Sequence, residues 1–424
     1  MNLGPTLSLM AGGTIKIVDA KEQLEMIRLS DRLNGLEESA TLAITAKART
    51  LKAQGRDVIG FGAGEPDFDT PQNIKDAAIK AIRDGQTKYT AVGGINELKD
   101  AIIAKFKRDN RLEYAREDVL VSCGGKHSIF NLFQAILNKG DEVIIPAPFW
   151  VSYPVMVSLG GGTPRIIHTT EGQGFKMSVD VFKANINKNT KAVVINSPSN
   201  PTGAAYTARE LEGLAEVALA NNVLIITDEI YEKLTYDGFA SSSIASASED
   251  VRKNSVVLNG VSKAYSMTGW RIGYAAGPRE IIKAMTNIQS QSTSNPTSIS
   301  QWAAVEALNG PQDAIAMMVR EFEKRRNAMV DGLNSIDGIS CLRPQGAFYV
   351  FANVSGVYGR SHKSKNINGS VDLANYLLDE AGIAVVPGEP FGDDSFVRLS
   401  YATSMDNVVN GVRRIGEAVG ALKA

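Results

Sequence analysis

The residues that most clearly could take part in chemistry lie in the stretch 259–273, where Lys263 and Arg271 stand eight positions apart. A lone lysine is usually a solvated surface group, but the sequence that follows Lys263 is too apolar for a surface loop. Burial lowers the pKa of a lysine because it disfavours the charged form. The neutral amine that results can attack a carbonyl carbon. This stretch therefore indicates a reactive amine beside a second cation.

Polar side chains also follow two apolar stretches. Residues 223–227 lead directly to Asp228, and a carboxylate at the end of an apolar strand is costly to remove from water without a cationic partner. Asp228 is therefore either the N-cap of a helix or a functional carboxylate, and Tyr231 follows three positions later. Asn200 stands between two prolines that restrict the backbone, so it belongs either to an ordinary polar turn or to a site.

A glycine-rich turn precedes a predicted helix at residues 123–126 (CGGK). The amide N–H groups at the start of a helix and the helix dipole favour a phosphate. Gly124, Gly125 and Lys126 are therefore candidates for binding one. The turn is not a Walker motif, because His127 stands where serine or threonine should follow the lysine.

Together these residues suit one cofactor, pyridoxal phosphate (PLP). Its aldehyde forms an imine with a neutral lysine amine, which Lys263 would supply. A buried aspartate keeps the pyridine nitrogen protonated, so that the ring can withdraw electrons from a carbanion, and Asp228 would take that role. Asn200 and Tyr231 would contact the ring oxygen. Arg271 and the backbone of residues 124–126 would hold the phosphate, and Trp150 or Phe149 would stack on the ring.

Composition excludes several other kinds of site. The 424 residues include three histidines and two cysteines with neither CxxC nor HxxxH, which excludes a disulfide framework and a Cys/His zinc cluster, and we expect no metal. A formal net charge of −1 offers no field that would attract nucleic acid, and no apolar stretch approaches the ~20 residues of a membrane-spanning helix. The stretch 60–64 (GFGAG) lacks the GxGxxG spacing of a dinucleotide fingerprint, and Pro66 prevents a helix from starting directly after it.

The N-terminal residues fit neither a secretory signal nor a transit peptide, because no lysine or arginine precedes Lys16 and acidic residues follow it. We interpret them as a loosely held extension. Two unpaired cysteines far apart in the sequence are typical of a reducing compartment, so we expect the protein in the cytoplasm.

Alternating helical and strand patterns predict the scaffold that positions the polar groups. Residues 72–85 carry Ile74, Ala78 and Ile82 at every fourth position, as on one face of a helix. Short apolar strands are predicted at residues 118–123, 142–146, 191–196, 223–227 and 255–258, with helices between them. Such alternation indicates a mostly parallel sheet covered on both faces. Sites in these sheets lie beyond the carboxyl ends of the strands, which is where the polar groups stand.

After residue 300 the pattern changes. A long helical stretch, broken near residues 309–311, leads to strands around 347–351, 384–386 and 396–400, with helices between and after them. We interpret this part as a second, smaller α+β domain that residues from the N-terminal part of the chain join. The expected organisation is an extension at 1–26, an arm and part of the small domain at 27–72, a large PLP-binding domain at 73–310 and a small C-terminal domain at 311–424.

Sequence motifs identify a family resemblance. SPSNPTG at 197–203, DEIY at 228–231, NGVSKAYSMTGWRIGY at 259–274 and FVRLSYA at 396–402 resemble those of class I aminotransferases of PLP fold type I. The likeness is strongest to bacterial aspartate aminotransferases of the branch that uses a lysine for the distal carboxylate, and it extends from about residue 27 to the C-terminus. It implies an α/β fold with a mostly parallel seven-stranded sheet in the large domain, a smaller α+β domain, and an obligate homodimer with shared active sites.

The resemblance also implies roles for individual residues. Lys263 would bond the cofactor and then act as acid and base, with Asp228 on the pyridine nitrogen and Tyr231 on the ring oxygen. The other residues that it assigns to the cofactor are Gly124, Gly125, Lys126, Trp150, Asn200, Ser262 and Arg271, together with Tyr89, which would reach the phosphate of the neighbouring subunit. Those that it assigns to the substrate are Gly62, Lys126, Trp150, Asn200 and Arg398, with Ser39 and Thr41 nearby. Its cis prolines would correspond to Pro148 and Pro201.

Arg398 has a physical argument of its own. It stands between Val397 and Leu399 in a predicted strand, so it is either an edge charge or a buried partner that binds a carboxylate through two hydrogen bonds. The second interpretation needs a ligand carboxylate, which every amino acid supplies. In the family, this arginine would bind the α-carboxylate of the substrate.

Two departures bear on how far the family pattern applies. Gly260 stands where the family often has a serine that contacts the phosphate, which leaves Ser262 as the nearest hydroxyl. Residues 289–296 (QSQSTSNP) contain no arginine, so the partner-subunit arginine of the other aspartate branch is absent. Lys126 fits the lysine-using branch, and a cation there favours dicarboxylic substrates.

The expected function is PLP-dependent transfer of the amino group from L-aspartate to 2-oxoglutarate, in a ping-pong cycle that yields oxaloacetate and L-glutamate. The alternatives are broader specificity that includes prephenate, or an aromatic or alanine aminotransferase. From other classes, a non-catalytic PLP-binding regulatory domain would need a DNA-binding segment, for which residues 1–30 are too short and too neutral, and a dehydrogenase would need a dinucleotide fingerprint in an unrecognised form. The expected partners are small amino acids, 2-oxo acids and a second copy of the chain, without nucleic acid or membrane.

Overall fold

The computed structural model describes residues 6–9, 15–18, 30–33, 40–363 and 365–423. The chain forms two compact units, residues 1–38 and 39–424. In the first unit, β1 (Thr6–Leu9) pairs antiparallel with β2 (Ile15–Val18), and a short 3₁₀ helix, η1 (Asp31–Leu33), follows. The described residues that line the candidate site belong to the second unit.

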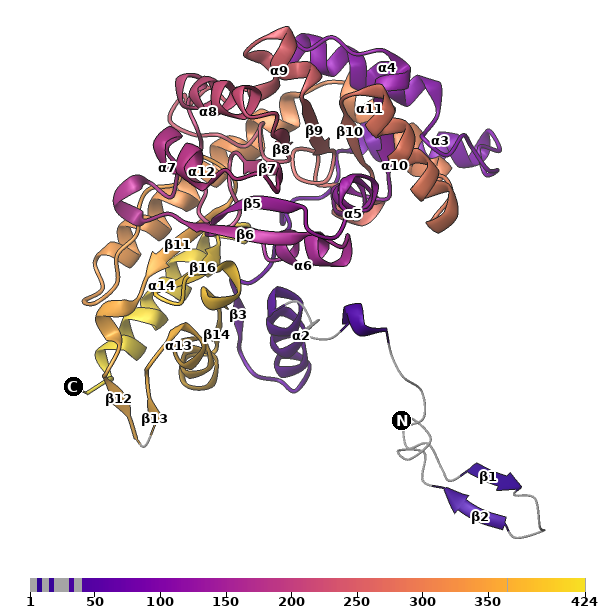
Figure 1. Ribbon diagram of the computed structural model, residues 1–424. Coiled ribbons are helices and arrows are strands. Elements are labelled where there is room, and N and C mark those ends of the chain that lie inside the picture. The colour runs from indigo at the N-terminus through magenta and orange to yellow at the C-terminus, as the bar shows by residue number, and fades with distance from the viewer. Residues whose placement is uncertain (1–5, 10–14, 19–29, 34–39, 364, 424) are drawn as a thin grey trace. The chain divides into compact units, whose positions relative to one another are not determined.

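A seven-stranded sheet is the main framework of the second unit (Figure 1). Its strands, in order across the sheet, are β4 (Val119–Ser122), β10 (Gly273–Ala276), β9 (Ser255–Gly260), β8 (Leu224–Asp228), β7 (Thr190–Asn196), β5 (Glu142–Ala147) and β6 (Thr163–His168). Neighbours are parallel except at β10, which is antiparallel to β4 and β9. Gly273 at the start of β10 pairs with Gly260 and Ser122, so β10 begins at the edge where the other strands end. The prediction of a mostly parallel seven-stranded sheet is confirmed.

Helices cover both faces of this sheet. Those packed on one face are α5 (Gly125–Ile136), α6 (Ser152–Leu159) and α10 (Arg279–Ser292), and those on the other are α7 (Val179–Asn185), α8 (Ala208–Ala220) and α9 (Glu249–Lys253), with α3 (Gln72–Arg83), α4 (Asn96–Lys105) and α11 (Ser298–Asn309) beside β4 and β10. In β7, Ala192 and Val194 face the first group, whereas Val193 and Ile195 face the second. Successive residues of a strand point to opposite faces, so a strand buried on both sides is apolar throughout.

The strand pattern does not predict β6 or β10. β6 is an edge strand whose side chains are mostly half-buried or exposed, so its sequence has no continuous apolar run. β10 reads Gly-Tyr-Ala-Ala, in which Tyr274 is the one large side chain. The other five strands carry the β-branched runs that mark a buried strand, and their predicted positions are confirmed.

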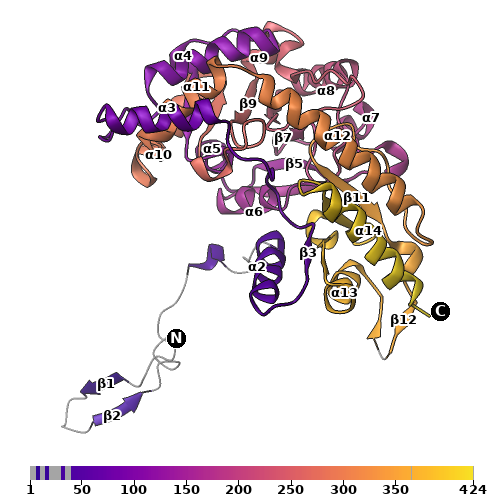
Figure 2. The ribbon, with the colours of Figure 1, turned by 180° about the vertical axis from the view of Figure 1, so that it is seen from behind.

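The C-terminal part forms an antiparallel sheet with helices against it. Its strands and helices are β11 (Tyr349–Asn353), β16 (Phe396–Ser400) and β15 (Val386–Pro387), with β16 in the middle, and α12 (Asp313–Asn334), α13 (Ser370–Tyr376) and α14 (Met405–Gly420). The helices α12 and α14 lie side by side (Figure 2). A small hairpin joins β12 (Ser361–His362) to β13 (Lys365–Asn366). The helical break predicted near residues 309–311 separates α11 from α12 and is confirmed.

Residues from the N-terminal part of the second unit join this C-terminal region. The strand β3 (Ile59–Gly60) pairs in parallel with β14 (Ile383–Ala384), and α2 (Ala40–Ala53) packs through Ala48 against Leu378. The domain boundaries expected at 72/73 and 310/311 stay a prediction.

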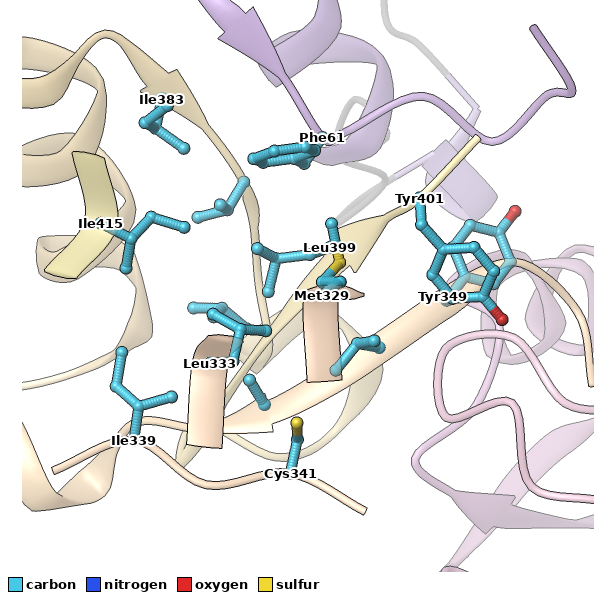
Figure 3. Close-up of a cluster of buried hydrophobic side chains, with 14 of the residues drawn as sticks. Phe61, Met329, Leu333, Ile339, Cys341, Tyr349, Ile383, Leu399, Tyr401 and Ile415 are labelled. Atoms are coloured by element: carbon cyan, nitrogen blue, oxygen red, sulfur yellow. The ribbon is translucent and has the colours of Figure 1, made fainter. Parts of the chain in front are cut away.

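A cluster of buried apolar side chains fixes the position of β16 (Figure 3). Phe61, which follows β3, belongs to the same buried cluster as Met329 and Leu333 of α12 and Leu399 of β16. The amide N–H of Ser400 also donates a hydrogen bond of 2.8 Å to the carbonyl oxygen of Phe61. These contacts hold the backbone around residue 62 beside β16, which matters for the site. In the part of the chain that the structure describes, no helix is both long and apolar enough to cross a membrane.

Candidate active site

The carboxyl ends of the strands enclose a cavity of about 340 Å³. Residues that follow β5, β7, β8 and β9 line it, and the segment before β10 does so because β10 runs the opposite way. The predicted site residues that line the cavity are Gly125, Lys126, Trp150, Asn200, Asp228, Tyr231, Ser262, Lys263, Arg271 and Arg398. The peptide bonds before Pro148 and Pro201 are cis, as the resemblance implies, and so is the bond before Pro198.

Lys263 follows β9 and lines the cavity, where its side chain is partly buried. Its Nζ donates a hydrogen bond of 2.5 Å to the carbonyl oxygen of Gly64. Burial lowers the pKa of Lys263 to about 8; the carboxylate of Glu65 opposes this shift, and the charges of Arg398 and Arg271 add to it. About a tenth of this amine is therefore neutral at pH 7, whereas an ordinary lysine has less than about a thousandth neutral.

Asp228 is the last residue of β8 and is 7% exposed. Its Oδ2 accepts a hydrogen bond of 2.6 Å from the hydroxyl of Tyr153, and its Oδ1 accepts one of 3.2 Å from the amide N–H of Ile230. Burial raises the pKa of Asp228, and both hydrogen bonds oppose that shift. A turn follows Asp228, so the interpretation as the N-cap of a helix is wrong. Among the described residues Asp228 forms no ion pair, which leaves it open to a cationic ligand.

Between β4 and α5 the chain turns through Gly124, whose φ of +89° lies in the left-handed region. A Cβ at Gly124 would collide with the guanidinium of Arg271. That guanidinium is held in place because Nη1 donates a bond of 2.8 Å to the carbonyl oxygen of Thr268 and Nη2 one of 3.4 Å to that of Cys123. The first amide N–H groups of α5 have no carbonyl partner within the helix. Together with Arg271 they form a cradle suited to an anion.

Arg398 lies in β16, the middle strand of its sheet, and is 1% exposed, so the interpretation as an edge charge is wrong. Nη1 donates a hydrogen bond of 2.9 Å to Oδ1 of Asn200, and Nη2 one of 2.9 Å to the carbonyl oxygen of Gly62. The guanidinium lies 4.5 Å from the ring centre of Tyr349. Its Nε is buried without a hydrogen-bond partner, and no carboxylate of the described residues pairs with it. Burial lowers the pKa of Arg398, and a ligand carboxylate would compensate this buried cation.

Aromatic side chains complete the lining. The hydroxyls of Tyr231 and Tyr349 are 2.9 Å apart, and both side chains are buried. The ammonium of Lys126 lies 5.0 Å from the ring centre of Trp150. Partial burial and the charge of Arg271 lower the pKa of Lys126. Besides Arg271 and Arg398, the cavity therefore holds a cation next to an aromatic face, Lys126.

Two lining tyrosines are not evident from the sequence. Tyr153 bonds Asp228, and Tyr349 bonds Tyr231 and lies beside Arg398. A tyrosine in a helix or strand is usually a core residue, and neither belongs to a motif. The available signal for Tyr153 was its place on α6 close after Trp150, which it meets edge-on at 5.2 Å.

Some predicted site residues do not line the cavity. Tyr89 is 91% exposed, and it lies in the loop that follows α3. Ser39 and the side chain of Thr41 lie outside the described residues. At Gly260 an added Cβ would be 3.1 Å from Cα of Gly273 on the neighbouring strand, so the packing leaves little room for the serine that the family often has there.

The residues of the site fit pyridoxal phosphate. A buried Asp228 without a cation suits a protonated ring nitrogen, and the cradle at Gly124 and Arg271 suits a phosphate. Lys263, with its lowered pKa, suits an aldehyde. The fold and the site thus define a PLP-dependent enzyme.

Comparisons with known proteins agree with this class. The family model described as aminotransferase class I and II matches residues 56–415. The chain is 54% identical to an aspartate aminotransferase of Bacillus sp. (strain YM-2) and 52% identical to an aspartate/prephenate aminotransferase of Nitrosomonas europaea, in each case over 392 residues that cover 92% of this chain and 99% of the relative. A solved structure of aspartate aminotransferase from Thermus thermophilus with maleate has a TM-score of 0.88 and 43% identity, and the match covers 93% of this chain and 100% of that chain.

The chain therefore belongs to the class I and II aminotransferases, and the family resemblance is confirmed. It is a PLP-dependent transaminase, and its substrates are amino acids and 2-oxo acids.

Proposed function

We propose that this enzyme transfers the amino group of L-aspartate to 2-oxoglutarate, giving oxaloacetate and L-glutamate in a ping-pong cycle. The observation that carries the proposal is a cavity with two cations suited to carboxylates, the buried Arg398 with its unpartnered Nε and Lys126 beside Trp150. An amino acid with a second carboxylate can engage both. Relatives named aspartate aminotransferase, and the Thermus enzyme with maleate, a dicarboxylate, support it.

Arg398 would bind the α-carboxylate of the substrate. Asn200 and Gly62 each take one N–H of the guanidinium, so its plane is held before the substrate arrives. The remaining N–H groups, including that of Nε, are then available to the two carboxylate oxygens. Because β16 is packed on both sides, the arginine loses little freedom on binding.

When bound, pyridoxal phosphate supplies the electron sink that stabilises negative charge at the α carbon of the amino acid. The carboxylate of Asp228, held by Tyr153, would keep a proton on the ring nitrogen. The Nζ of Lys263 would take the proton from the α carbon and later release it, which its pKa of about 8 permits. The hydroxyl of Tyr231, held by Tyr349, would donate a hydrogen bond to the ring oxygen.

Lys126 would bind the distal carboxylate of a dicarboxylic substrate. Its ammonium is placed by contact with the Trp150 ring, and Trp150 would also stack on the cofactor ring. We assign Ser39 and Thr41 to the same end of the substrate, by the resemblance to the lysine-using branch. This division of work gives each carboxylate its own cation.

The working enzyme in this proposal is a homodimer in the cytoplasm. Tyr89, an aromatic side chain that is 91% exposed, would reach the phosphate held at Arg271 of the other subunit. Both cysteines, Cys123 and Cys341, are free, which agrees with a reducing compartment. Within each subunit, residues 73–310 and 311–424 would form the large and the small domain.

The second candidate is an aspartate/prephenate aminotransferase. The Nitrosomonas relative that carries this name is 52% identical over 92% of the chain, nearly as similar as the Bacillus enzyme. Rates with aspartate as donor and either 2-oxoglutarate or prephenate as acceptor separate the two candidates. Activity with 2-oxoglutarate alone would leave the first.

Replacing Lys126 tests the dicarboxylate assignment. Lys126→Ala should lower kcat/KM for aspartate about ten- to a hundredfold more than for alanine, because only aspartate loses a hydrogen bond to a charged group. Lys139→Ala, at an exposed position just beyond α5, is the matched control and should leave both values unchanged. If Lys126→Ala lowered kcat/KM for aspartate and for alanine by the same factor, Lys126 would not bind the distal carboxylate.

A further inference from the structure

Two fully buried glutamines lie outside the cavity and have no part in the chemistry proposed above. Gln289 on α10 and Gln301 on α11 are each 0% exposed. A buried amide is costly unless its donors and acceptor are satisfied. Each of the two side chains forms part of its hydrogen bonds with the same loop, residues 90–95.

Gln289 ties this loop to the central sheet. Its Nε2 donates hydrogen bonds of 2.8 Å to the carbonyl oxygens of Val92 in the loop and of Val121 in β4. Its Oε1 accepts one of 3.1 Å from Nδ2 of Asn131 on α5. One side chain thus joins the loop, the strand β4 and the helix α5.

Gln301 closes the loop at its two ends. Its Oε1 accepts a hydrogen bond of 2.8 Å from the amide N–H of Ile95, and its Nε2 donates one of 3.1 Å to Oγ1 of Thr90. The same Nε2 donates a bond of 2.9 Å to the carbonyl oxygen of Pro296. The first and last residues of the loop are therefore held by one buried side chain.

The backbone of the loop is also packed against β4. Gly94 has a φ of +100°, and a Cβ there would lie 2.6 Å from a methyl group of Val121. The amide N–H of Val121 donates a bond of 3.0 Å to the carbonyl oxygen of Gly93. Residues 82–89 immediately before the loop are all exposed, and they end in Tyr89. An exposed tyrosine thus directly precedes a tightly anchored segment.

We propose that Gln289 and Gln301 are positioning residues, which lock residues 90–95 against β4 so that Tyr89 is presented in a fixed orientation to a second copy of this chain. The same strand β4 leads into the phosphate cradle at Gly124 of its own subunit. The loop that follows Tyr89 and the phosphate cradle are therefore both attached to β4. A tyrosine held in this way loses less conformational freedom when it binds the partner's phosphate. The inference rests on the proposed role of Tyr89 in the dimer.

A double-mutant cycle in the full-length protein tests this inference. Thr90→Val removes the hydroxyl that Gln301 bonds at a half-buried position, Thr90→Ser keeps it as the control, and Gln301→Met removes the amide at similar size. The measurement is the dissociation constant of PLP titrated into the apoenzyme, with Tyr89 present or replaced by phenylalanine. Thr90→Val should weaken binding roughly fivefold, the factor typical of one hydrogen bond, while Thr90→Ser should not. In the Tyr89→Phe background, neither Thr90→Val nor Gln301→Met should weaken it further.

The outcomes separate this inference from the proposed function. If Thr90→Val and Gln301→Met weaken PLP binding by the same factor with and without the Tyr89 hydroxyl, the glutamines are merely structural and the inference is overturned, while the role of Tyr89 stands. If Tyr89→Phe alone leaves the dissociation constant unchanged, the role of Tyr89 fails and the inference fails with it. If Gln301→Met does not fold, the comparison of Thr90→Val with Thr90→Ser decides.

Discussion

Replacing Tyr153 with phenylalanine examines whether Asp228 is held as a buried carboxylate. The Tyr153 hydroxyl donates the shorter of the two hydrogen bonds that Asp228 accepts, 2.6 Å against 3.2 Å from the amide of Ile230. A hydrogen bond to a charged group contributes about 1.5–3 kcal/mol to stability. Tyr153→Phe should therefore lower the free energy of unfolding of the apoprotein by about 2 kcal/mol at pH 8, where the carboxyl group is ionised.

The size of this loss should depend on pH. Because burial raises the pKa of Asp228 above its value in the unfolded chain, the ionised carboxylate is costly only in the folded state. That cost is absent below the unfolded pKa and fully present above the folded pKa. Tyr153 reduces the cost by bonding the charge, so its removal raises the folded pKa further. At pH 4, close to the ordinary pKa of 3.8 that burial raises, a larger share of folded Asp228 is protonated than at pH 8, so the loss should shrink toward about 1 kcal/mol, the value of a neutral hydrogen bond.

Urea unfolding of the apoprotein at the two pH values measures the difference directly. Tyr376→Phe is the matched control, because the Tyr376 hydroxyl donates a buried bond of 2.7 Å to the neutral carbonyl oxygen of Ala418. Its loss should be about 1 kcal/mol at both pH values. If Tyr153→Phe lost the same amount as Tyr376→Phe at pH 8 and at pH 4, the reasoning that Tyr153 stabilises an ionised Asp228 would be refuted.

Two other residues of the site give predictions of their own. Arg398→Lys keeps the charge but loses the planar guanidinium that bonds Asn200 and Gly62, so kcat/KM should fall about 10- to 100-fold for aspartate and alanine alike. Steady-state rates with the two substrates measure this fall. A loss confined to aspartate would assign Arg398 to the distal carboxylate instead. The rate at which PLP bonds the apoenzyme should rise with pH around a midpoint near 8, because only the neutral amine of Lys263 reacts. Stopped-flow absorbance measures that rate, and a midpoint near the ordinary value of 10.5 would contradict the lowered pKa.

The fold was predictable where burial is uniform. Strands β5, β7, β8 and β9 are apolar on both faces because helices cover both, and β4 shares this pattern, so each leaves a continuous run in the sequence. β6 and β10 leave no such run, the first because it is a half-exposed edge and the second because small residues form most of it. The pairing of the two-residue strands β3 and β14 joins segments that lie far apart in the sequence, which no local pattern can show.

The site was predictable where motif residues perform the chemistry, and less so where other residues position them. Lys263, Asp228 and Arg398 stand out because a charged side chain in an apolar stretch is costly to bury unless it has a partner or a function. Tyr153 and Gln301 do not stand out, since their importance comes from contacts with segments far away in sequence, the carboxylate of Asp228 in one case and the loop at residues 90–95 in the other. Only the tertiary structure brings these partners together.

Asp228 and Arg398 are two buried charges of opposite sign that line one cavity, yet no ion pair joins them. Each is instead bonded to neutral groups, Asp228 to Tyr153 and Arg398 to Asn200 and Gly62. Neutral hydrogen bonds offset only part of the several kcal/mol that each buried charge costs, so the apoprotein carries a desolvation cost already incurred in folding. A protonated ring nitrogen and a substrate carboxylate bring the two missing charges. When these two groups bind, electrostatic attraction is gained without a further cost of desolvating or reorganising the protein groups. This is why a site that destabilises the empty fold can bind its ligands in one orientation.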